Sequence, residues 1–323
     1  MNTGFIGLGN VGAKLAGSLL RNGYDLLVHD VDFDAGRALV DRGAVWVDSG
    51  KQMAETCDVV ITCLPSPAVS AQVMEEAGGV LEGMAPGKIW LEMSSTDADE
   101  VRRIGARVEE QGAFALDCPV SGGCHRAATG NIAIFAGGRR DAFEKVLPLL
   151  TTIGRNVLHT GELGSASILK VATNFLAGVQ LISTGEAFMV AKKAGIDLGV
   201  AYEAIRISSG NSFVHETEGQ LILNGSYNIN FTMDHEVKDL TLFDDLGKKY
   251  DLPLEMSPLA VQIMRDGLAR YGPRAWSSMV VKRLEDACNE DLRAPGFPEY
   301  LTDEEPEGAG SEVKPRQAER QGV

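Results

Sequence analysis

The chain has 323 residues, 44% of them hydrophobic and 23% charged, which indicates a soluble globular protein of two domains and excludes disordered, collagen-like and small disulfide-rich proteins. The net charge of −15 disfavours nucleic-acid binding, because no dense run of Lys or Arg offsets the repulsion of a phosphate backbone. The 37 glycines and only 6% aromatic residues indicate many tight turns, which favours an α/β chain.

The cysteine pattern predicts neither a disulfide framework nor a zinc site, because the count of five is odd and no Cys-x-x-Cys pair occurs. We therefore expect a reducing, cytoplasmic location. No basic leader precedes the first apolar run, so we expect no targeting signal. The longest apolar stretch, Val171 to Val190, is interrupted by Asn174, Gln180, Ser183 and Glu186, so we interpret it as a buried helix and expect no membrane partner.

Short β-type runs alternate with helical patterns over about the first 160 residues, and the first helix is expected from Val11. This alternation predicts βαβ units on a parallel, doubly wound sheet. The predicted strands are Gly4–Ile6, Leu26–Val28, Val59–Ile61, Ile89–Leu91, Phe114–Leu116 and Ile132–Phe135.

The pattern changes after Gly161, and from there to about Asn289 the apolar spacing is helical. We predict a nucleotide-binding domain over residues 1–162 and an all-helical domain over residues 163–293. Pro, Gly and Glu dominate residues 294–323, which we expect to be a flexible tail.

A dinucleotide-binding motif follows the first predicted strand directly, in the residues Gly7, Leu8, Gly9, Asn10, Val11 and Gly12. Its glycines permit a tight turn, close approach of a pyrophosphate and close helix packing, which is the Rossmann arrangement. The second strand ends near Asp30, where a carboxylate can accept both ribose hydroxyls and repel a 2′-phosphate. The glycine motif and Asp30 together predict NAD rather than NADP. The alternative is a glycine-rich turn with Asp30 capping the next segment.

Two further strand ends are expected to line the ligand crevice, because the carboxyl ends of parallel strands face it. Cys63, Leu64 and Pro65 follow the strand at residues 59–61, and we interpret Cys63 as backbone lining rather than a reactive thiol. Ser94, Ser95 and Thr96 form a run of three hydroxyl-bearing residues after the strand at residues 89–91. That run either lines the nicotinamide pocket or caps the helix that begins near Asp97.

Two candidate elements of a catalytic site follow. The segment Asp117 to Gly123 is a strand end running into a turn whose N–H groups could hold a carboxylate, although it could also be a simple turn. Lys170 and Asn174 then stand four residues apart on one face of an apolar helix. An apolar wall lowers the pKa of a lysine and makes it a candidate proton shuttle; the alternative is a lysine that snorkels to solvent.

These motifs together resemble those of the β-hydroxyacid dehydrogenase family, in particular its 3-hydroxyisobutyrate dehydrogenase group, from about Thr3 to about Leu284. The resemblance rests on four motifs in the family's order. They are Gly7 to Gly12, Asp117 to Gly130, Gly161 to Asn174, and Lys238-Asp239-Leu240.

The resemblance implies a Rossmann domain, a long linking helix and a helical domain that forms a homodimer or homotetramer. It also implies roles for individual residues, with Lys170 as the acid/base and Asn174 orienting Lys170 or the substrate. Lys238 is expected over the active site, in contact with substrate and cofactor. The substrate carboxylate is expected to bind at Ser121, Gly122 and Gly123.

Two positions depart from the family pattern. Thr173 stands where an Asn is usual, next to the retained Asn174. Arg126 stands three residues past Gly123, where a glycine is usual, and we interpret it as a substrate-binding residue that reaches a second anionic group. The alternative is a side chain that turns outward and pairs with a surface carboxylate.

The resulting hypothesis is oxidation of a small anionic β-hydroxy acid, with hydride transfer to NAD and proton transfer to Lys170, without a metal ion. An NADPH-dependent semialdehyde or imine reductase of the same superfamily is one alternative. Against it stand Val31, where such a reductase usually has a basic residue, and Lys170, which imine reductases normally lack. The other alternative is a nucleotide-binding sensor, which would have lost Lys170 and the anion turn.

Overall fold

The computed structural model describes residues 1–315, and the chain divides into two compact units. The chain passes from the first unit into the second inside one helix, between Ser167 and Ile168, a few residues after the predicted boundary at residue 162. The first unit comprises Met1–Gly122, Arg126–Ser167 and residues 305–315, and the second comprises Gly123–His125 and Ile168–Glu304.

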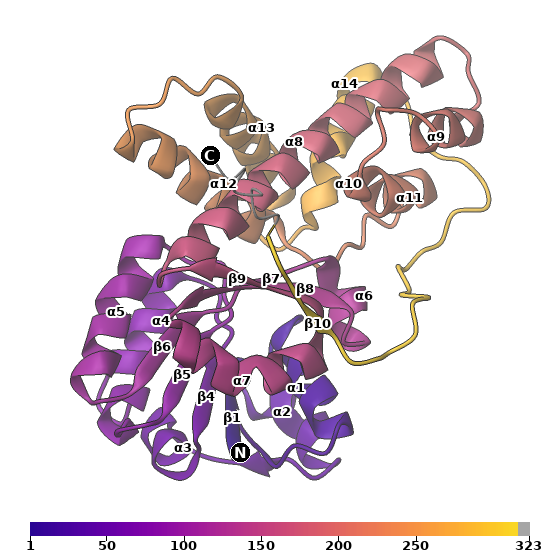
Figure 1. The fold of residues 1–323 in the computed structure, drawn as a ribbon. Helices are drawn as coiled ribbons and strands as arrows, with labels where there is room; N and C mark the ends of the chain where they lie inside the picture. Colours follow the sequence, from indigo (N-terminus) through magenta and orange to yellow (C-terminus); the bar gives the residue numbers. More distant parts are fainter. Residues whose placement is uncertain (316–323) are drawn as a thin grey trace, which may run out of the picture. The chain divides into compact units, whose positions relative to one another are not determined.

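The first unit is built on one sheet, ten-stranded among the described residues, with β7 (Val120–Ser121) paired to β8 beside the main strand order β10-β9-β8-β6-β5-β4-β1-β2-β3 (Figure 1). All six predicted strands are confirmed. They are β1 (Thr3–Ile6), β2 (Leu26–His29), β4 (Val59–Thr62), β5 (Ile89–Glu92), β6 (Phe114–Asp117) and β8 (Ile132–Gly138). The sequence did not predict β3 (Val45–Trp46), β7, β9 (Gly154–Gly161) and β10 (Ser311–Val313). Strands β1 to β6 pair in parallel, whereas β8 runs antiparallel to β6.

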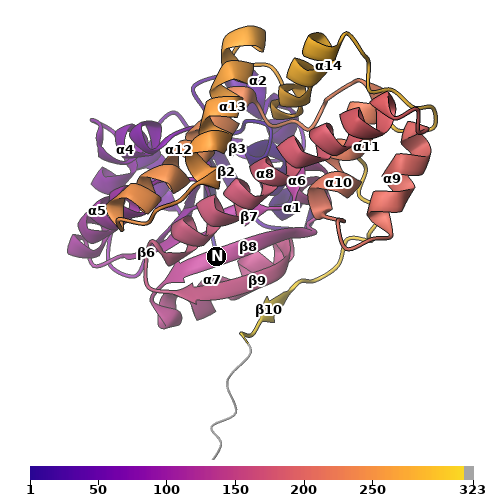
Figure 2. The ribbon, with the colours of Figure 1, turned by 90° about the horizontal axis from the view of Figure 1, so that it is seen from above.

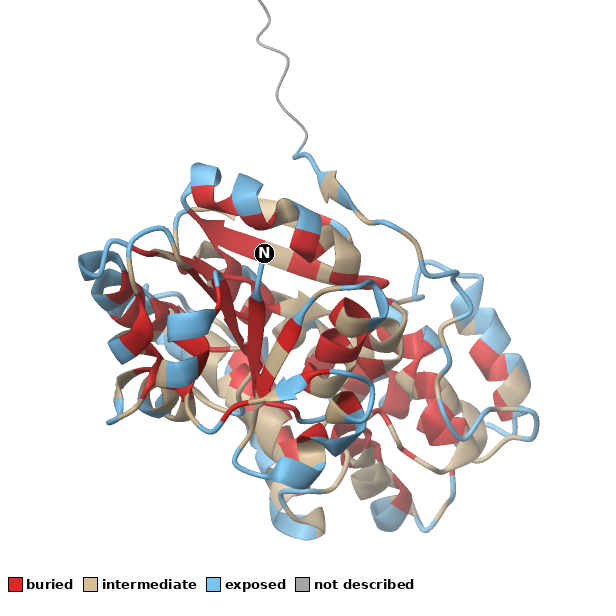
Figure 3. Ribbon diagram, turned by 90° about the horizontal axis from the view of Figure 1, so that it is seen from below, coloured by how far each residue is buried: buried red, intermediate tan, exposed pale blue. Residues whose placement is uncertain are grey.

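Both faces of this sheet are covered, which explains why β1, β4 and β5 are buried at every position (Figure 3). Phe5, Ile61 and Leu91 belong to one apolar cluster, and their chain neighbours Ile6, Val60 and Trp90 belong to another. This alternation follows from the two-residue period of a strand. The helices between these strands are α1 (Gly12–Arg21), α2 (Phe33–Val40), α3 (Gly50–Thr56), α4 (Pro67–Glu75), α5 (Ala98–Glu110), α6 (Gly123–Ala128) and α7 (Arg140–Ile153), with a 3₁₀ turn at Val80–Gly83.

The described residues of the second unit form helices joined by loops, as predicted, with one isolated antiparallel bridge between Thr232 and Trp276. Its core contains Phe188, Ile222, Met233 and Met264, each almost fully buried. The helices are α8 (Ser165–Lys193), α9 (Leu198–Arg206), α10 (Phe213–Glu216), α11 (Glu218–Asn224), α12 (Met233–Lys249), α13 (Met256–Tyr271) and α14 (Lys282–Cys288), with a 3₁₀ turn at Ser277–Val281.

Helix α8 contains the apolar stretch that was expected to be buried, and it is buried only in part, since Leu169, Leu176 and Val190 are exposed. By length and composition, α8 is the one helix within residues 1–315 that could cross a membrane. A single such helix is weak evidence of a span, because core helices of soluble proteins have the same length and composition.

The expectation of a flexible tail from residue 294 is wrong for residues 305–315. Strand β10 pairs in parallel with β9 at the sheet edge, with Ser311 opposite Asn156 and Val313 opposite Leu158 (Figure 2). The Glu307 carboxylate accepts hydrogen bonds from the side chains of Ser18, Arg21 and Asn22, which lie at the end of α1. Composition missed this segment because its three-residue strand is bound through backbone groups, which leave no apolar pattern. Residues 316–323 lie outside the described residues.

Candidate active site

The three glycines of the dinucleotide motif have different surroundings. A Cβ atom at Gly7, whose φ is +94°, would lie 2.3 Å from the carbonyl oxygen of Cys63, and one at Gly12 would lie 2.0 Å from the carbonyl oxygen of Gly7. No atom lies within 4 Å of a Cβ built at Gly9. Gly7 and Gly12 therefore allow the loop to pack, whereas Gly9 leaves open space at the point where a pyrophosphate approaches the loop.

Asp30 is bound to this loop. Its Oδ2 atom accepts a hydrogen bond of 2.6 Å from the backbone N–H of Leu8, and its Oδ1 atom accepts one of 3.0 Å from Asp32. The N-cap of α2 is Asp32, and Asp30 binds the backbone N–H of that cap residue as well as the glycine loop. Helix α1 begins after Val11 without a side-chain cap, and the N–H groups of Ala13 and Lys14 donate to the carbonyl oxygens of Gly9 and Val11. These residues fit a dinucleotide.

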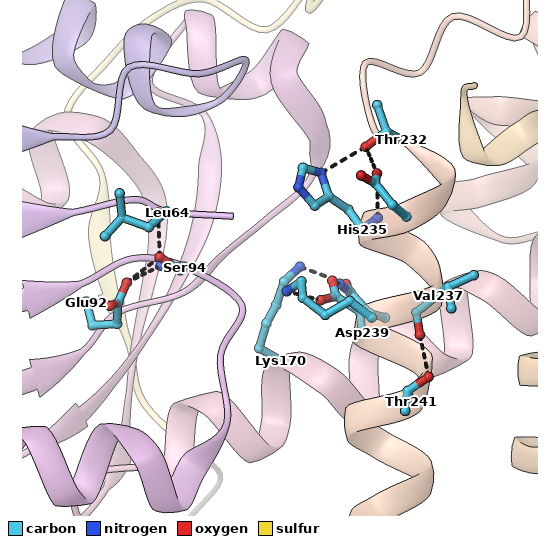
Figure 4. Close-up of polar contacts among 12 residues, drawn as sticks. Leu64, Glu92, Ser94, Lys170, Thr232, His235, Val237, Asp239 and Thr241 are labelled. Carbon is cyan, nitrogen blue, oxygen red and sulfur yellow. Dashed lines mark hydrogen bonds and ion pairs between the residues drawn. The ribbon is translucent and has the colours of Figure 1, made fainter. Parts of the chain in front are cut away.

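At the next strand ends, Ser94 links two loops. Its hydroxyl accepts a 2.7 Å hydrogen bond from the backbone N–H of Leu64 and donates one to the buried carboxylate of Glu92 (Figure 4). Asp97 caps α5 by accepting from the N–H groups of residues 99 and 100, so the capping alternative for Ser94 to Thr96 is wrong. Thr96 is buried, and its place beside a nicotinamide stays a prediction, as do the roles of Cys63 and Pro65.

The predicted anion turn is a tight turn of left-handed backbone after β7, with φ values of +127° at Gly122 and +88° at Gly123. Only glycine adopts such angles readily, which explains the Ser121-Gly122-Gly123 sequence. The Arg126 side chain packs along this turn, because its Cδ atom lies 3.4 Å from the position of a Cβ at Gly122. The aliphatic part of the Arg126 side chain therefore lies against the predicted carboxylate site, and it carries the guanidinium group.

Lys170 lies on α8 and is buried, with only 7% of its surface exposed. Its Nζ atom donates a 2.7 Å hydrogen bond to Oδ1 of Asn174, the pair that the four-residue spacing predicted. Burial lowers the pKa of Lys170 to about 8, although the nearby Asp239 and Glu236 carboxylates oppose this shift. The alternative of a lysine that snorkels to solvent is wrong.

Asp239 joins this pair to α12. Its carboxylate, which is fully buried, accepts hydrogen bonds from Nδ2 of Asn174 and, at 2.6 Å, from Nζ of Lys238 (Figure 4). Asp239 therefore brings Lys170, Asn174 and Lys238 together, although the sequence indicated Asp239 only as part of a motif. The sequence signal that could have pointed to this role is the position of the acid Asp239 directly after Lys238.

Asp117 is a second residue whose role the sequence did not reveal. At the end of β6, it accepts hydrogen bonds from the backbone N–H groups of Gly164 (2.8 Å) and Ser167 (2.6 Å) and from the Ser167 hydroxyl. These are the groups at the start of α8, which would otherwise be unsatisfied. Burial raises the pKa of Asp117, and the three hydrogen bonds oppose that shift. Asp117 thus anchors the helix that carries Lys170.

A dinucleotide-binding sheet followed by a helical unit with a buried, readily titrated lysine defines a nicotinamide-dependent oxidoreductase. Two sequence families match the chain: "NAD binding domain of 6-phosphogluconate dehydrogenase" over residues 2–161, and "NAD-binding of NADP-dependent 3-hydroxyisobutyrate dehydrogenase" over residues 164–284. The chain belongs to the β-hydroxyacid dehydrogenase family, in its 3-hydroxyisobutyrate dehydrogenase-like group.

Known relatives match over most of their length. The 2-(hydroxymethyl)glutarate dehydrogenase of Eubacterium barkeri is 33% identical over 87% of this chain and 94% of its own. Human mitochondrial 3-hydroxyisobutyrate dehydrogenase is 31% identical over 85% of this chain and 84% of its own. The crystal structure of 3-hydroxyisobutyrate dehydrogenase from Salmonella typhimurium has a TM-score of 0.80 at 30% identity, over 88% of this chain and 99% of that one. Solved imine reductases at 18% to 20% identity share the fold alone.

Proposed function

We propose that this protein is an NAD-dependent dehydrogenase that oxidises the hydroxyl group of a small β-hydroxy acid, with Lys170 as the acid/base. The observation that carries the proposal is the hydrogen-bonded set of Lys170, Asn174 and Asp239 inside the helical unit. A solvent-facing lysine has a pKa near 10.4 and is almost entirely protonated at neutral pH. The buried amine of Lys170 is partly neutral there, as an acceptor of protons must be.

In this scheme the substrate loses a hydride from its alcohol carbon and a proton from its hydroxyl, giving a carbonyl. A nicotinamide cofactor, when bound, takes up the hydride. The neutral amine of Lys170 accepts the proton and later releases it to water. Asn174 holds the amine in place, and Asp239 holds Asn174. The turn at Ser121, Gly122 and Gly123 is the proposed site of the substrate carboxylate.

The choice of NAD is supported by Asp30 and Val31. Asp30 is fixed against the glycine loop, where a carboxylate accepts ribose hydroxyls and repels a 2′-phosphate. Val31 is fully exposed and brings no cation to bind that phosphate. The family description for residues 164–284 names NADP, so both cofactors belong in the test.

A second anionic group on the substrate is part of the proposal. Arg126 packs along the predicted carboxylate turn, and a guanidinium can bind a carboxylate, sulfonate or phosphate in a bidentate manner. One relative is named for 2-(hydroxymethyl)glutarate, which has two carboxylates. We therefore favour a doubly anionic hydroxy acid over plain hydroxyisobutyrate.

We further propose that the helical unit pairs with a second copy of the chain, as a homodimer or part of a homotetramer. Within residues 1–315, twelve of the 17 large hydrophobic side chains that are exposed lie in this unit, among them Leu176 and Val190 of α8. Exposed apolar side chains that gather into a contiguous area mark an interaction surface, and such an area on this unit is part of the proposal. Light scattering with size-exclusion chromatography tests the pairing, and a monomer at micromolar concentration contradicts it.

We also propose a cytoplasmic location. The five cysteines are all thiols, which fits a reducing compartment.

The deciding experiment is a panel of small β-hydroxy acids with one or two anionic groups, each with NAD and with NADP. Absorbance at the reduced-nicotinamide band reports turnover. We expect turnover with NAD and the highest kcat/KM on a doubly anionic acid. Turnover only of imines or semialdehydes with NADPH contradicts the proposal, and dinucleotide binding without any turnover favours a sensor.

A further inference from the structure

One face of α8 carries Lys170, Asn174 and Gly178 at intervals of four residues, so they are stacked one helical turn apart. Opposite this face, α12 carries Asp239 and, three residues before it, Glu236. A Cβ atom at Gly178 would lie only 2.6 Å from Oε1 of Glu236. Gly178 therefore leaves the space that admits the Glu236 carboxyl against α8, one turn from Asn174.

Glu236 is buried, with 6% of its surface exposed. Its Oε1 atom has no hydrogen-bond partner within residues 1–315. A buried carboxylate without hydrogen bonds is strongly destabilised relative to the neutral acid, because burial removes the water that would solvate its charge. Burial accordingly raises the pKa of Glu236 to about 8. Unlike Asn174 and Asp239, this carboxyl plays no part in the scheme above.

The charged groups that act on Glu236 come from three helices. Asp239 on α12 and Glu218 on α11 oppose its ionisation, whereas Lys170 on α8 favours it. Lys170 in turn responds to Asp239 and Glu236, which favour its ammonium form, and to Lys238, which opposes it. Burial also raises the pKa of Glu218 to about 7, so this acid is partly neutral near physiological pH.

We propose that Glu236 is a positioning residue that controls when the Lys170 amine releases its proton. The inference rests on the proposed function, in which the neutral amine accepts the proton of the substrate hydroxyl. While Glu236 is neutral, it adds nothing to the negative charge of Asp239, which favours the ammonium form of Lys170. Once Glu236 ionises, its charge stabilises the ammonium form. The two side chains therefore titrate as a coupled pair, and the amine becomes neutral over a broader and more alkaline range than it would alone.

The direct test measures the Lys170 titration without substrate. ¹³C-lysine NMR follows the Cε resonance of Lys170 between pH 5 and 11, assigned by its loss in Lys170→Arg. In Glu236→Gln, which keeps the shape but never ionises, we expect the Lys170 midpoint to fall by about one pH unit. Glu236→Asp keeps the charge but withdraws it by one methylene, and we expect a midpoint between those of Gln and wild type.

Asp245→Asn is the matched control, since Asp245 is an exposed acid on the same helix that pairs with Lys248. Its midpoint should equal that of the wild type. A Glu236→Gln midpoint within about 0.2 pH units of wild type would overturn the proposal, even if that variant is less stable or less active. If the Glu236→Gln variant does not fold, a Lys170 midpoint in Glu236→Asp that equals the wild-type midpoint overturns the proposal.

Kinetics provide the second readout. If the hydroxy-acid panel yields a substrate, the alkaline rise of kcat/KM for oxidation should shift in Glu236→Gln by the same amount as the NMR midpoint. An unshifted rise, with a shifted midpoint, contradicts the role in catalysis. If no hydroxy acid is oxidised, the proposed function fails, while the NMR comparison still decides whether Glu236 governs Lys170.

Discussion

At the scale of single residues, Lys170 gives the simplest prediction. Lys170→Met removes the proton acceptor and should lower kcat at least about 100-fold while leaving NADH affinity nearly unchanged. Steady-state kinetics and NADH fluorescence titration measure the two effects. Lys192→Met, in the last turn of the same helix, is the control and should be as active as wild type. Retained turnover in Lys170→Met would assign the proton transfer to another group.

The pKa of Lys170 predicts the pH dependence of the wild type. Oxidation needs the neutral amine, which forms as the pH rises through the pKa of about 8. The kcat/KM for oxidation should therefore rise between about pH 7 and 9, whereas reduction, which needs the ammonium form, should fall over the same range. A profile for oxidation that is flat across this range would contradict the assignment.

Arg126 tests the substrate class. A charged substrate group left unpaired in a binding site loses about 2 to 5 kcal/mol of interaction. Arg126→Gly should therefore lose at least about tenfold in kcat/KM on a doubly anionic hydroxy acid and little on a singly anionic one. Equal losses on both substrates, or none on either, would mean that Arg126 does not bind the second anion.

At the scale of secondary-structure elements, Asp117 and Asp97 make a matched comparison, since each binds backbone N–H groups at the start of a helix. Asp117 is buried beneath α8, and Asn in its place can satisfy only part of the three donors. We expect Asp117→Asn to reduce the free energy of unfolding by about 2 kcal/mol. Asp97→Asn should change it by less than about 0.5 kcal/mol, because Asn caps a solvated helix as well as Asp. Urea titration compares them, and equal effects would refute the anchoring role.

Elements with a strong local pattern were predictable from the sequence, and elements defined by distant partners were not. The strands with buried apolar runs, and the glycine loop, can each be recognised from a few consecutive residues. The roles of Asp117 and Asp239 depend on groups about 50 and 65 residues away in the sequence. The Glu236 carboxyl occupies space beside Gly178 that a Cβ atom would take up, and nothing near Glu236 in the sequence indicates that.

At the scale of the whole molecule, residues 305–315 return to the first unit and bind it through Glu307 and β10. A chain ending at residue 304 would lose these contacts and expose the edge of β9. We expect its first unfolding transition to fall by several degrees, since a loss of about 1 kcal/mol shifts the midpoint by about 2 to 4 °C in a folding unit of roughly 150 to 250 residues, the size range of the first unit. A chain ending at residue 315 supplies the baseline, and calorimetry measures both. Identical midpoints would show that the segment contributes nothing.

The pairing of β10 with β9 also constrains how the protein is made. About 150 residues separate the two strands, which a ribosome adding 5 to 20 residues per second needs roughly 8 to 30 seconds to translate. The first unit can collapse during this interval, but its sheet then ends in an unpaired β9, the kind of edge that recruits foreign strands. Newly made chains are consequently most prone to aggregate in this window, so slower elongation through the helical unit should lower the soluble yield.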